Sequence, residues 1–235
     1  MKTMVFADAN TVAWEAAKLI AAEARSAVAK NGRFVIAVSG GHTPWQMLRA
    51  WGNEDVPWDR VHVVQVDERV APAGHPDRNL THLRESLLEK APLPPNQIYA
   101  MPVEAANLET AAAAYSQTLG QLSGLPPVLD LAHLGLGPDG HTASLVPGDP
   151  VLEVTDRAVA MTGVYQARRR MTLTYPVLNR SRRILWVVTG GEKVEMLRRL
   201  QTGDVTIPAG RISPERALIL ADRAAANSSD QGRDQ

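Results

Sequence analysis

Short, continuous runs of apolar residues recur along the chain, separated by longer segments in which apolar positions repeat at helical spacing. Runs of about four to eight apolar residues that end at glycine, proline or charged residues are typical of strands buried on both faces of a parallel sheet. We expect such strands over residues 33–39, 61–66, 98–101, 129–136, 157–161, 171–174, 184–189 and 217–221.

The segments between these runs predict helices. We expect them over residues 8–30, 79–90, 104–122 and 194–200, with one more directly after Thr43. Asp8 or Asn10 can cap the first helix, and Asn31-Gly32 ends it. Because strands and helices alternate at this spacing, the predicted fold class is α/β: a mainly parallel, Rossmann-like sheet with helices on both faces.

The length of the chain, 235 residues, suffices for one large α/β domain, and no linker, repeat or charge block divides it. We therefore expect a single domain over residues 1–223, followed by a disordered tail over residues 224–235. Lysine plus arginine and aspartate plus glutamate each total 25, so the charge does not indicate a nucleic-acid partner.

The sequence contains no cysteine, which excludes disulfide bonds, thiolate metal sites and a cysteine nucleophile, and fits a reducing compartment. No stretch approaches the roughly 18 apolar residues of a membrane span, and the first residues lack the apolar core of a signal peptide. We expect a cytoplasmic protein with no membrane partner.

The most informative stretch is residues 129–148, where an apolar run stops at Gly137-Pro138-Asp139-Gly140-His141. Ligands of open α/β sheets bind beyond the carboxyl ends of the strands, which is where Asp139 and His141 would stand. Three glycines here suit a site where the backbone approaches a ligand closely. A solvated, glycine-rich turn is the alternative. We expect residues 142–144 to begin a short helical turn.

Residues 135–140 also spell G-x-G-x-x-G, the fingerprint of dinucleotide-binding folds. That fingerprint needs a helix that opens inside the motif and an acid that ends the next strand. Pro138 breaks the turn, and the nearest acid downstream, Asp156, precedes a predicted strand. We therefore expect no nicotinamide or flavin cofactor.

A second glycine-rich loop follows the strand at residues 33–39. Gly40 and Gly41 leave backbone N–H groups free to face an anion, Thr43 is placed to cap a helix, and Pro44 suits its first turn. This order predicts a phosphate loop. An ordinary strand-to-helix turn is the alternative, since the lysine of a Walker loop is absent.

Charged residues also follow two other predicted strands. Asp67, Glu68 and Arg69 come directly after residues 61–66, where they could meet a polar substrate or form a solvated loop. Lys193 would open the helix at residues 194–200, and a lysine there opposes the helix dipole unless it faces an anion. A solvated lysine is the alternative. Every one of these clusters falls at the carboxyl end of a strand, which predicts one common site.

The available chemistry is limited. The sequence has no G-x-S-x-G elbow and no H-E-x-x-H motif, so a covalent serine mechanism and a zinc hydrolase are poorly supported. Histidine has an ordinary pKa of about 6.5 and can accept a proton from water at neutral pH without a metal. The residues thus predict acid–base chemistry, free of metal and cofactor, on an easy electrophile within a small phosphorylated molecule.

Five motifs of this sequence resemble those of the 6-phosphogluconolactonase family, in the family's order and over nearly the whole chain. They are residues 38–44 (VSGGHTP), 66–69 (VDER) with Pro72 and Asn79 following, 134–148 (LGLGPDGHTASLVPG), 170–174 (RMTLT) and 190–193 (GGEK).

The resemblance implies hydrolysis of 6-phospho-D-glucono-1,5-lactone to 6-phosphogluconate. His141 matches the base that activates water, and Asp139 would hold its imidazole or help to transfer protons. The substrate-binding residues implied are Ser39, Gly40, Gly41, Thr43, Asp67, Arg69, Gly137, Gly140, Arg170 and Lys193. The amides of residues 40–43, with Arg170 and Lys193, would hold the phosphate, and either Arg69 or the amides of residues 137–140 would face the oxyanion at C1.

One departure from the family pattern lies shortly before residues 170–174. Family members often carry a Lys-Pro pair there, whereas this chain has Tyr165-Gln166-Ala167-Arg168. Arg168 or Arg169 is a candidate substitute for that lysine.

Two other functions stay open: a glucosamine-6-phosphate deaminase or isomerase, and a non-catalytic sugar-phosphate sensor. The deaminases carry an acid shortly after D-G-H, which residues 143–147 lack, and no DNA-binding segment precedes Arg33. The expected partner is a small sugar phosphate, and we expect a monomer.

Overall fold

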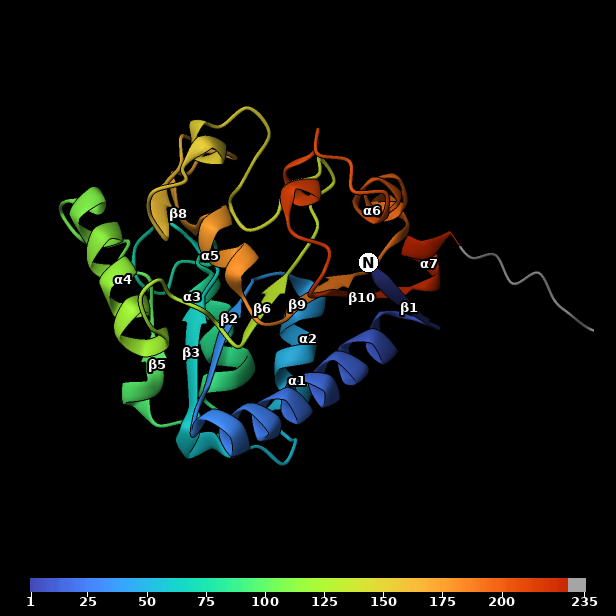
Figure 1. Cartoon of the computed structure of the whole chain (residues 1–235), viewed down its shortest axis with the longest axis horizontal. Helices are drawn as coiled ribbons and strands as arrows, with labels where there is room; N and C mark the ends of the chain where they lie inside the picture. Colours follow the sequence, from blue (N-terminus) through green and yellow to red (C-terminus); the bar gives the residue numbers. More distant parts are fainter. Residues whose placement is uncertain (228–235) are drawn as a thin grey trace, which may run out of the picture.

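The computed structural model describes residues 1–227, and its central feature is a seven-stranded sheet in which every pair of neighbouring strands is parallel (Figure 1). The order across the sheet is β1-β10-β9-β6-β2-β3-β5. The strands are β1 (Lys2–Phe6), β2 (Phe34–Val38), β3 (Val61–Gln65), β5 (Ile98–Tyr99), β6 (Leu131–Leu134), β9 (Ile184–Val188) and β10 (Ala217–Asp222). The predicted α/β fold is therefore confirmed.

The strand order reverses direction between β2 and β6. From β2 the chain proceeds to β3 and β5 on one side, whereas β6 is followed by β9 and β10 on the other. The loops after β2 and β6 consequently diverge and leave a crevice at their carboxyl ends, the position where open α/β sheets bind ligands. The two glycine-rich loops predicted to carry the site are the ones that leave these two strands.

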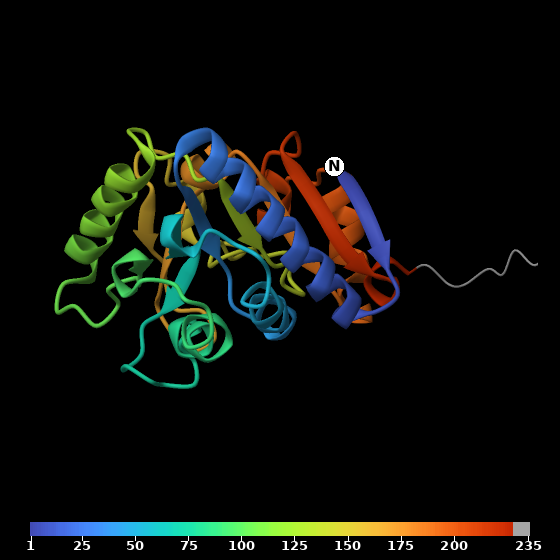
Figure 2. The same ribbon diagram turned by 90° about the horizontal axis from the view of Figure 1, so that it is seen from below.

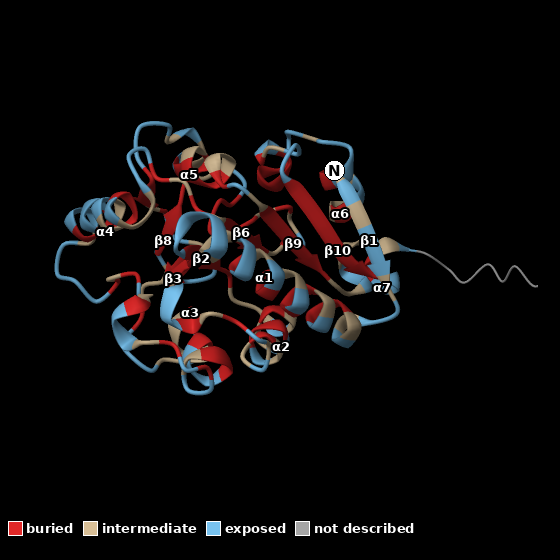
Figure 3. Ribbon diagram, turned by 60° about the horizontal axis from the view of Figure 1, so that its bottom comes forward, coloured by how far each residue is buried: buried red, intermediate tan, exposed pale blue. Residues whose placement is uncertain are grey.

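Helices cover both faces of the sheet, as expected (Figure 2). Side chains of β2 alternate between the two cores: Phe34, Ile36 and Val38 face the helices α1 and α2, whereas Val35 and Ala37 face α4, α5 and α6. The α-helices are α1 (Ala9–Asn31), α2 (His42–Trp51), α3 (Asn79–Leu83), α4 (Leu108–Ser123), α5 (Tyr175–Arg180), α6 (Val194–Gln201) and α7 (Arg223–Ala226). Figure 3 shows the sheet buried between these layers.

Several short helical turns complete the described chain. They are the 3-10 turns η1 (Trp58–Arg60), η3 (Pro95–Gln97), η4 (Pro150–Glu153), η5 (Gly191–Lys193) and η6 (Pro208–Arg211), and the π-helix η2 (Arg84–Leu88), which continues α3. Together α3 and η2 occupy most of the helix predicted over residues 79–90.

The ends of the long helices follow local capping rules. The Asp8 carboxylate accepts the N–H of Thr11 at 2.7 Å and begins α1, and Gly32 ends it with a φ of 76°. The start of α4 lies later than predicted because Asn107 caps it by accepting the N–H of Thr110 at 3.0 Å. β1 was not predicted, since this edge strand is largely exposed and begins with two polar residues.

A second, antiparallel sheet of β4 (Asp67–Arg69), β8 (Arg170–Leu173) and β7 (Val159–Met161) lies beside the main sheet. The interpretation of residues 67–69 as a possible solvated loop is therefore wrong. Glu68 is fully buried, where its carboxylate accepts the backbone N–H groups of Asn79 and Leu80 and pairs with the Arg78 guanidinium at 3.1 Å. A carboxylate whose charge is balanced by an arginine, and whose oxygens accept hydrogen bonds, can be buried away from water.

Residues 142–144 do not begin a helical turn, contrary to expectation. Thr142 forms an isolated β-bridge with Leu145, and Ala143 has a φ of 52°, which is incompatible with a right-handed helix. The first residues of the predicted tail belong to α7, and residues 228–235 lie outside the described part of the chain. Among the described helices, none is long and apolar enough to cross a membrane.

Candidate active site

A cavity of about 190 Å³ opens at the reversal point of the sheet. Its lining combines the loops after β2 and β6 with both ends of β4, the start of α3, the start of β8 and the N-terminus of α6. The lining residues are Ser39, Gly40, Asp67, Arg69, Asn79, Gly135, Leu136, Gly137, Pro138, His141, Ala143, Arg170 and Lys193. The sequence-predicted clusters therefore meet in one place, although they are far apart along the chain.

His141 and Asp139 form a hydrogen-bonded pair at this cavity. The imidazole Nδ1 lies 2.5 Å from Asp139 Oδ1, which also accepts the backbone N–H of His141 at 3.2 Å. The other carboxylate oxygen, Oδ2, accepts the hydroxyl of Tyr165 at 2.9 Å. Because Nδ1 faces the carboxylate, Nε2 is the ring nitrogen left for another molecule.

The environment keeps Asp139 ionised. Partial burial opposes the charge, but the electrostatic attraction of His141 and the hydrogen bonds from His141 and Tyr165 outweigh it and lower the pKa of Asp139. An ionised Asp139 accepts a hydrogen bond from Nδ1–H of His141 and thereby selects the tautomer whose Nε2 is free to act as a base.

Gly137 is required for this arrangement. A Cβ atom at Gly137 would overlap the Nδ1 and Cε1 atoms of the His141 ring. The backbone of the loop therefore supports the imidazole directly, and the N–H of Gly137 donates to the His141 carbonyl at 2.8 Å. Glycine at this position is explained by close approach of a side chain.

Two arginines bring unused donors to the same cavity. The Nε atoms of Arg69 and Arg170 are buried and have no hydrogen-bond partner among the described residues. Burial, and then the positive charge of Arg69, lower the pKa of Arg170. An anion bound in the cavity would accept hydrogen bonds from these donors. Its negative charge would also offset the repulsion between the two guanidinium groups.

A second cavity of about 330 Å³ adjoins the first and shares Gly40, Gly135, Leu136 and Lys193 with it. Gly41 and Thr43 line this neighbouring space. The N–H groups of Gly40 and Gly41 have no acceptor within residues 1–227. His141 and the predicted phosphate loop thus lie on the same side of the sheet, in adjoining hollows that together suit an elongated, anionic ligand.

Three predicted site residues behave differently from expectation. Thr43 does not cap α2: the cap position is Gly41, and the Thr43 hydroxyl lies 2.6 Å from that of Thr189. Gly140 faces away from the cavity, since a Cβ there would meet Ile207. Two groups of Ser39 donate hydrogen bonds to His133 of β6. Its backbone N–H donates to Nδ1 at 3.3 Å, and its hydroxyl donates to the carbonyl at 2.9 Å.

Asp67 lines the cavity, but both of its carboxylate oxygens already accept hydrogen bonds from other side chains. Its Oδ2 accepts the Ser144 hydroxyl at 2.6 Å, and its Oδ1 accepts the Asn79 amide at 3.2 Å. Asp67 therefore fastens the loop after β6 to the second sheet. No cluster of three or more His, Asp or Glu side chains suited to a metal ion occurs within the described part of the chain.

The comparison with protein families agrees with these features. The family model of glucosamine-6-phosphate isomerases/6-phosphogluconolactonase matches residues 7–220. The chain belongs to this family. The resemblance noted in the sequence is confirmed.

Within the glucosamine-6-phosphate isomerase/6-phosphogluconolactonase family, the chain is similar to 6-phosphogluconolactonases of several bacteria. It is 37% identical over 198 residues to that of Synechocystis sp., covering 81% of this chain and 82% of that protein. It is 34% identical over 236 residues to that of Mycobacterium tuberculosis, covering 94% and 96%.

Solved structures of the family share the fold. A 6-phosphogluconolactonase of Thermotoga maritima superposes with a TM-score of 0.84 at 24% identity, covering 94% of this chain and 98% of that one. A monomeric glucosamine-6-phosphate deaminase also gives 0.84, at 20% identity, covering 97% and 99%. At such identities these likenesses show the fold alone, so the choice between the family's activities depends on the residues of the site.

Two polar side chains at this site were not predicted to belong to it. Asn79 begins α3 and lines the cavity beside Gly40, whose Cβ position its side chain occupies. In the sequence Tyr165 is only a departure from the family motif, yet its hydroxyl donates a hydrogen bond to Asp139. The sequence order D-G-H carries a signal for the dyad, whereas nothing near Tyr165 indicates that it reaches a residue 26 positions earlier.

Arg168, a candidate substitute for the family's lysine, does not line the cavity. Its guanidinium pairs with Asp77 at 3.0 Å and lies 3.3 Å from His75, on the outer side of the site. Arg169 pairs with Glu109 of α4 at 3.2 Å. These two arginines fasten loops to one another, and Lys193 remains the lysine of the cavity.

Proposed function

We propose that this chain hydrolyses 6-phospho-D-glucono-1,5-lactone to 6-phospho-D-gluconate, in the oxidative branch of the pentose phosphate pathway. The observation that supports it most directly is the combination, in one cavity, of a carboxylate-held imidazole with two arginines that have unpaired donors. The adjoining glycine loop supplies amides for a remote phosphate.

In the proposed mechanism, His141 acts as the general base. Nε2 takes a proton from water while the water oxygen attacks the lactone carbon C1, and Asp139 stabilises the imidazolium that forms. The tetrahedral intermediate then breaks its bond between C1 and the ring oxygen. The ring oxygen receives the proton from the imidazolium, and the open-chain acid leaves.

The negative oxygen formed at C1 needs hydrogen-bond donors. The N–H of Gly137 is bonded to the His141 carbonyl, and that of Gly140 is bonded to the Gly137 carbonyl at 3.1 Å. Both amides are therefore occupied within the loop. We favour Arg69 as the donor, because its Nε is buried at the cavity without a partner in the described chain.

We assign the phosphate to the side of the site where the two cavities join. Lys193 lines both cavities, and the amides of Gly40 and Gly41 lie beside it. Arg170 supplies a second positive charge from β8. Binding a phosphate so far from C1 positions the ring, so the contact increases turnover as well as affinity.

A glucosamine-6-phosphate deaminase is the second candidate, because the fold of one such enzyme matches equally well. The residues count against it. After His141 the chain continues with Thr142, Ala143 and Ser144, and the acid that deaminases carry shortly after D-G-H is missing. A sensor without catalytic activity would not need the hydrogen-bonded dyad.

The test is hydrolysis of freshly prepared 6-phosphogluconolactone, measured as acid release above the spontaneous rate with EDTA present. We expect His141→Asn to lower kcat by about 10²- to 10⁴-fold, the usual contribution of a general base. Binding of 6-phosphogluconate, followed by calorimetry, should change little.

The matched control is His62→Asn, which removes an imidazole from β3 that lies outside both cavities. Its kcat should equal that of the unmodified chain. Full activity of His141→Asn would contradict the assignment of the base, and equal turnover of glucosamine 6-phosphate would favour the second candidate.

We further propose that the protein works as a monomer in the cytoplasm. A glucosamine-6-phosphate deaminase of the same fold, which is monomeric, supports the proposal of a monomer.

A further inference from the structure

Tyr165 lies at the tip of the hairpin between β7 and β8. Its N–H donates to the Arg168 carbonyl at 2.9 Å, and the Arg168 N–H returns to the Tyr165 carbonyl at 3.2 Å, which closes a two-residue turn. Both central residues, Gln166 and Ala167, have positive φ angles, the pattern of a type I′ turn. The hairpin tip is therefore a defined structure that directs the Tyr165 side chain towards Asp139.

The Tyr165 hydroxyl completes the bonding of the Asp139 carboxylate. Oδ2 accepts this hydroxyl at 2.9 Å, while Oδ1 faces His141. With both oxygens bonded, the carboxylate plane is fixed, and so is the direction in which it holds the imidazole. The Tyr165 ring also contacts the imidazole, with ring centroids 5.5 Å apart and planes inclined at 67°.

The same ring lies under the guanidinium of Arg170, whose Cζ is 4.9 Å from the ring centroid. The neighbouring Gln166 accepts a hydrogen bond from Arg170 at 3.0 Å. The hairpin tip is fastened on its outer side as well, because Arg168 binds Asp77, whose carbonyl accepts Arg69 at 2.8 Å. One short turn thus contacts His141 and Arg170 directly and is linked to Arg69 through Asp77.

From these contacts we propose that Tyr165 is a positioning residue for the reaction: it fixes Asp139, and through Asp139 the orientation of the His141 imidazole. The inference rests on the proposed role of His141. Tyr165 itself does not line the cavity, so its effect is transmitted through the dyad.

The test compares Tyr165→Phe with the unmodified chain. Removing the hydroxyl leaves the ring contacts with His141 and Arg170 in place, so KM should stay within about twofold. The value of kcat should fall about tenfold, the effect of losing a hydrogen bond to a charged group. Because Asp139 then carries a less dispersed charge, the acidic limb of the kcat profile should move to higher pH.

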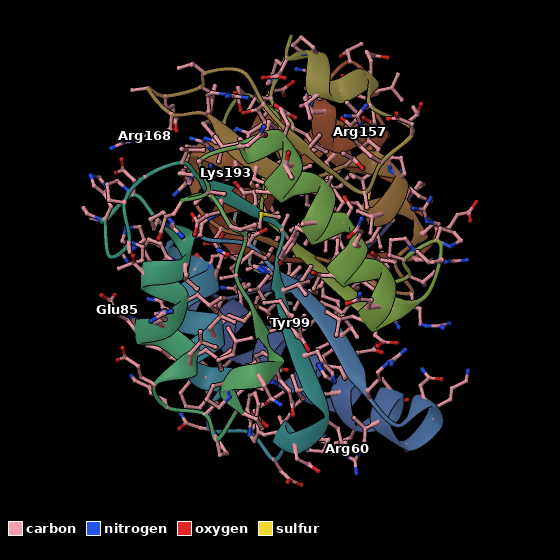
Figure 4. The ribbon with its side chains drawn as sticks, turned by 90° about the vertical axis from the view of Figure 1, so that its left-hand side faces the viewer. Arg60, Glu85, Tyr99, Arg157, Arg168 and Lys193 are labelled. Atoms are coloured by element: carbon pink, nitrogen blue, oxygen red, sulfur yellow. The ribbon has the colours of Figure 1, made fainter. Side chains whose placement is uncertain are left out.

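Tyr99→Phe is the matched control. Tyr99 also places its hydroxyl beside an imidazole, 3.2 Å from His62 Nδ1, but it belongs to the edge strand β5 and lies outside both cavities. Figure 4 shows Tyr99 well separated from Arg168 at the hairpin tip. This variant should keep the kcat and the pH profile of the unmodified chain.

A second measurement separates this inference from the proposed function. The proton on Nδ1 of His141 gives a nuclear magnetic resonance signal that can be followed without substrate. Tyr165→Phe should change the chemical shift of this proton, because the hydroxyl that fixes its acceptor, Asp139, is removed. An unchanged chemical shift would overturn the positioning role even if the chain proved not to be a lactonase. Unchanged kcat in Tyr165→Phe, with His141→Asn inactive, would overturn it while leaving the proposed function intact.

Discussion

At the scale of single residues, the orientation of His141 depends on the absence of a side chain at Gly137. The imidazole packs on the bare backbone there, and Asp139, two residues earlier than the histidine, binds its Nδ1. In the same cavity, a Cβ at Gly40 would likewise overlap the side chain of Asn79. The site is thus built by side chains that lie directly on glycine backbone.

Gly137→Ala should therefore lower activity without unfolding the protein. The added Cβ would displace the imidazole, and a displacement of about 1 Å commonly costs about 10²-fold in rate. We expect such a fall in kcat, measured with 6-phosphogluconolactone. The control is Gly191→Ala, where a Cβ meets nothing within 4 Å. Equal activity of the two variants would contradict this account.

At the scale of elements, the two strands that flank the crevice are joined through a buried histidine. His133 of β6 is fully buried, and its Nδ1 accepts the N–H of Ser39 at the end of β2. Burial lowers the pKa of His133 to about 3. The neutral ring is needed for this bond, because a protonated Nδ1 would carry a hydrogen and could not accept one.

This pKa makes the stability of the protein depend on pH. The ordinary histidine pKa of about 6.5 applies to the unfolded chain, so between that value and about 3 the unfolded chain binds a proton that the folded chain does not. Stability is therefore complete above about pH 6.5 and falls as the pH drops, by up to about 1.4 kcal/mol per pH unit from this group.

Denaturant titrations at pH values from 7 to 4 test whether the free energy of unfolding falls as the pH drops. His133→Asn retains an acceptor near the position of Nδ1 and removes the titrating ring, so its free energy of unfolding should fall less steeply with acidity. His42→Asn, which removes an exposed imidazole, should keep the steeper slope. Equal slopes for the unmodified chain and His133→Asn would refute the assignment.

The elements themselves were predicted where the pattern was local. α1 shows its cap, its spacing and its final glycine in nearby residues. β2 and β9 are uninterrupted apolar runs, and β6 is an apolar run with a single polar residue, His133. β4 was missed because its charged residues resemble a solvated loop, and the partners that bury Glu68 come from residues 78–80. No local pattern contains that information.

At the scale of the whole molecule, the reversal of strand order brings the separate loops to one crevice, and the second sheet adds Arg69 and Arg170 to it. For the proposed monomer, light scattering coupled to gel filtration should give a mass near 25.5 kDa at micromolar concentration. A mass of twice that value would contradict the monomer.

The sequence by itself determined the α/β class, the main strands and helices, the dyad of Asp139 and His141, and the glycine loop at residues 40 and 41. Each of these is written in neighbouring residues, because helical and strand periodicity and the D-G-H order are local. The second sheet, the burial of Glu68, the unpaired donors of Arg69 and Arg170, and the contact of Tyr165 with Asp139 were decided only by the tertiary structure. They depend on packing between segments far apart in the chain, and hydrogen bonding across such distances leaves no periodic trace in the sequence.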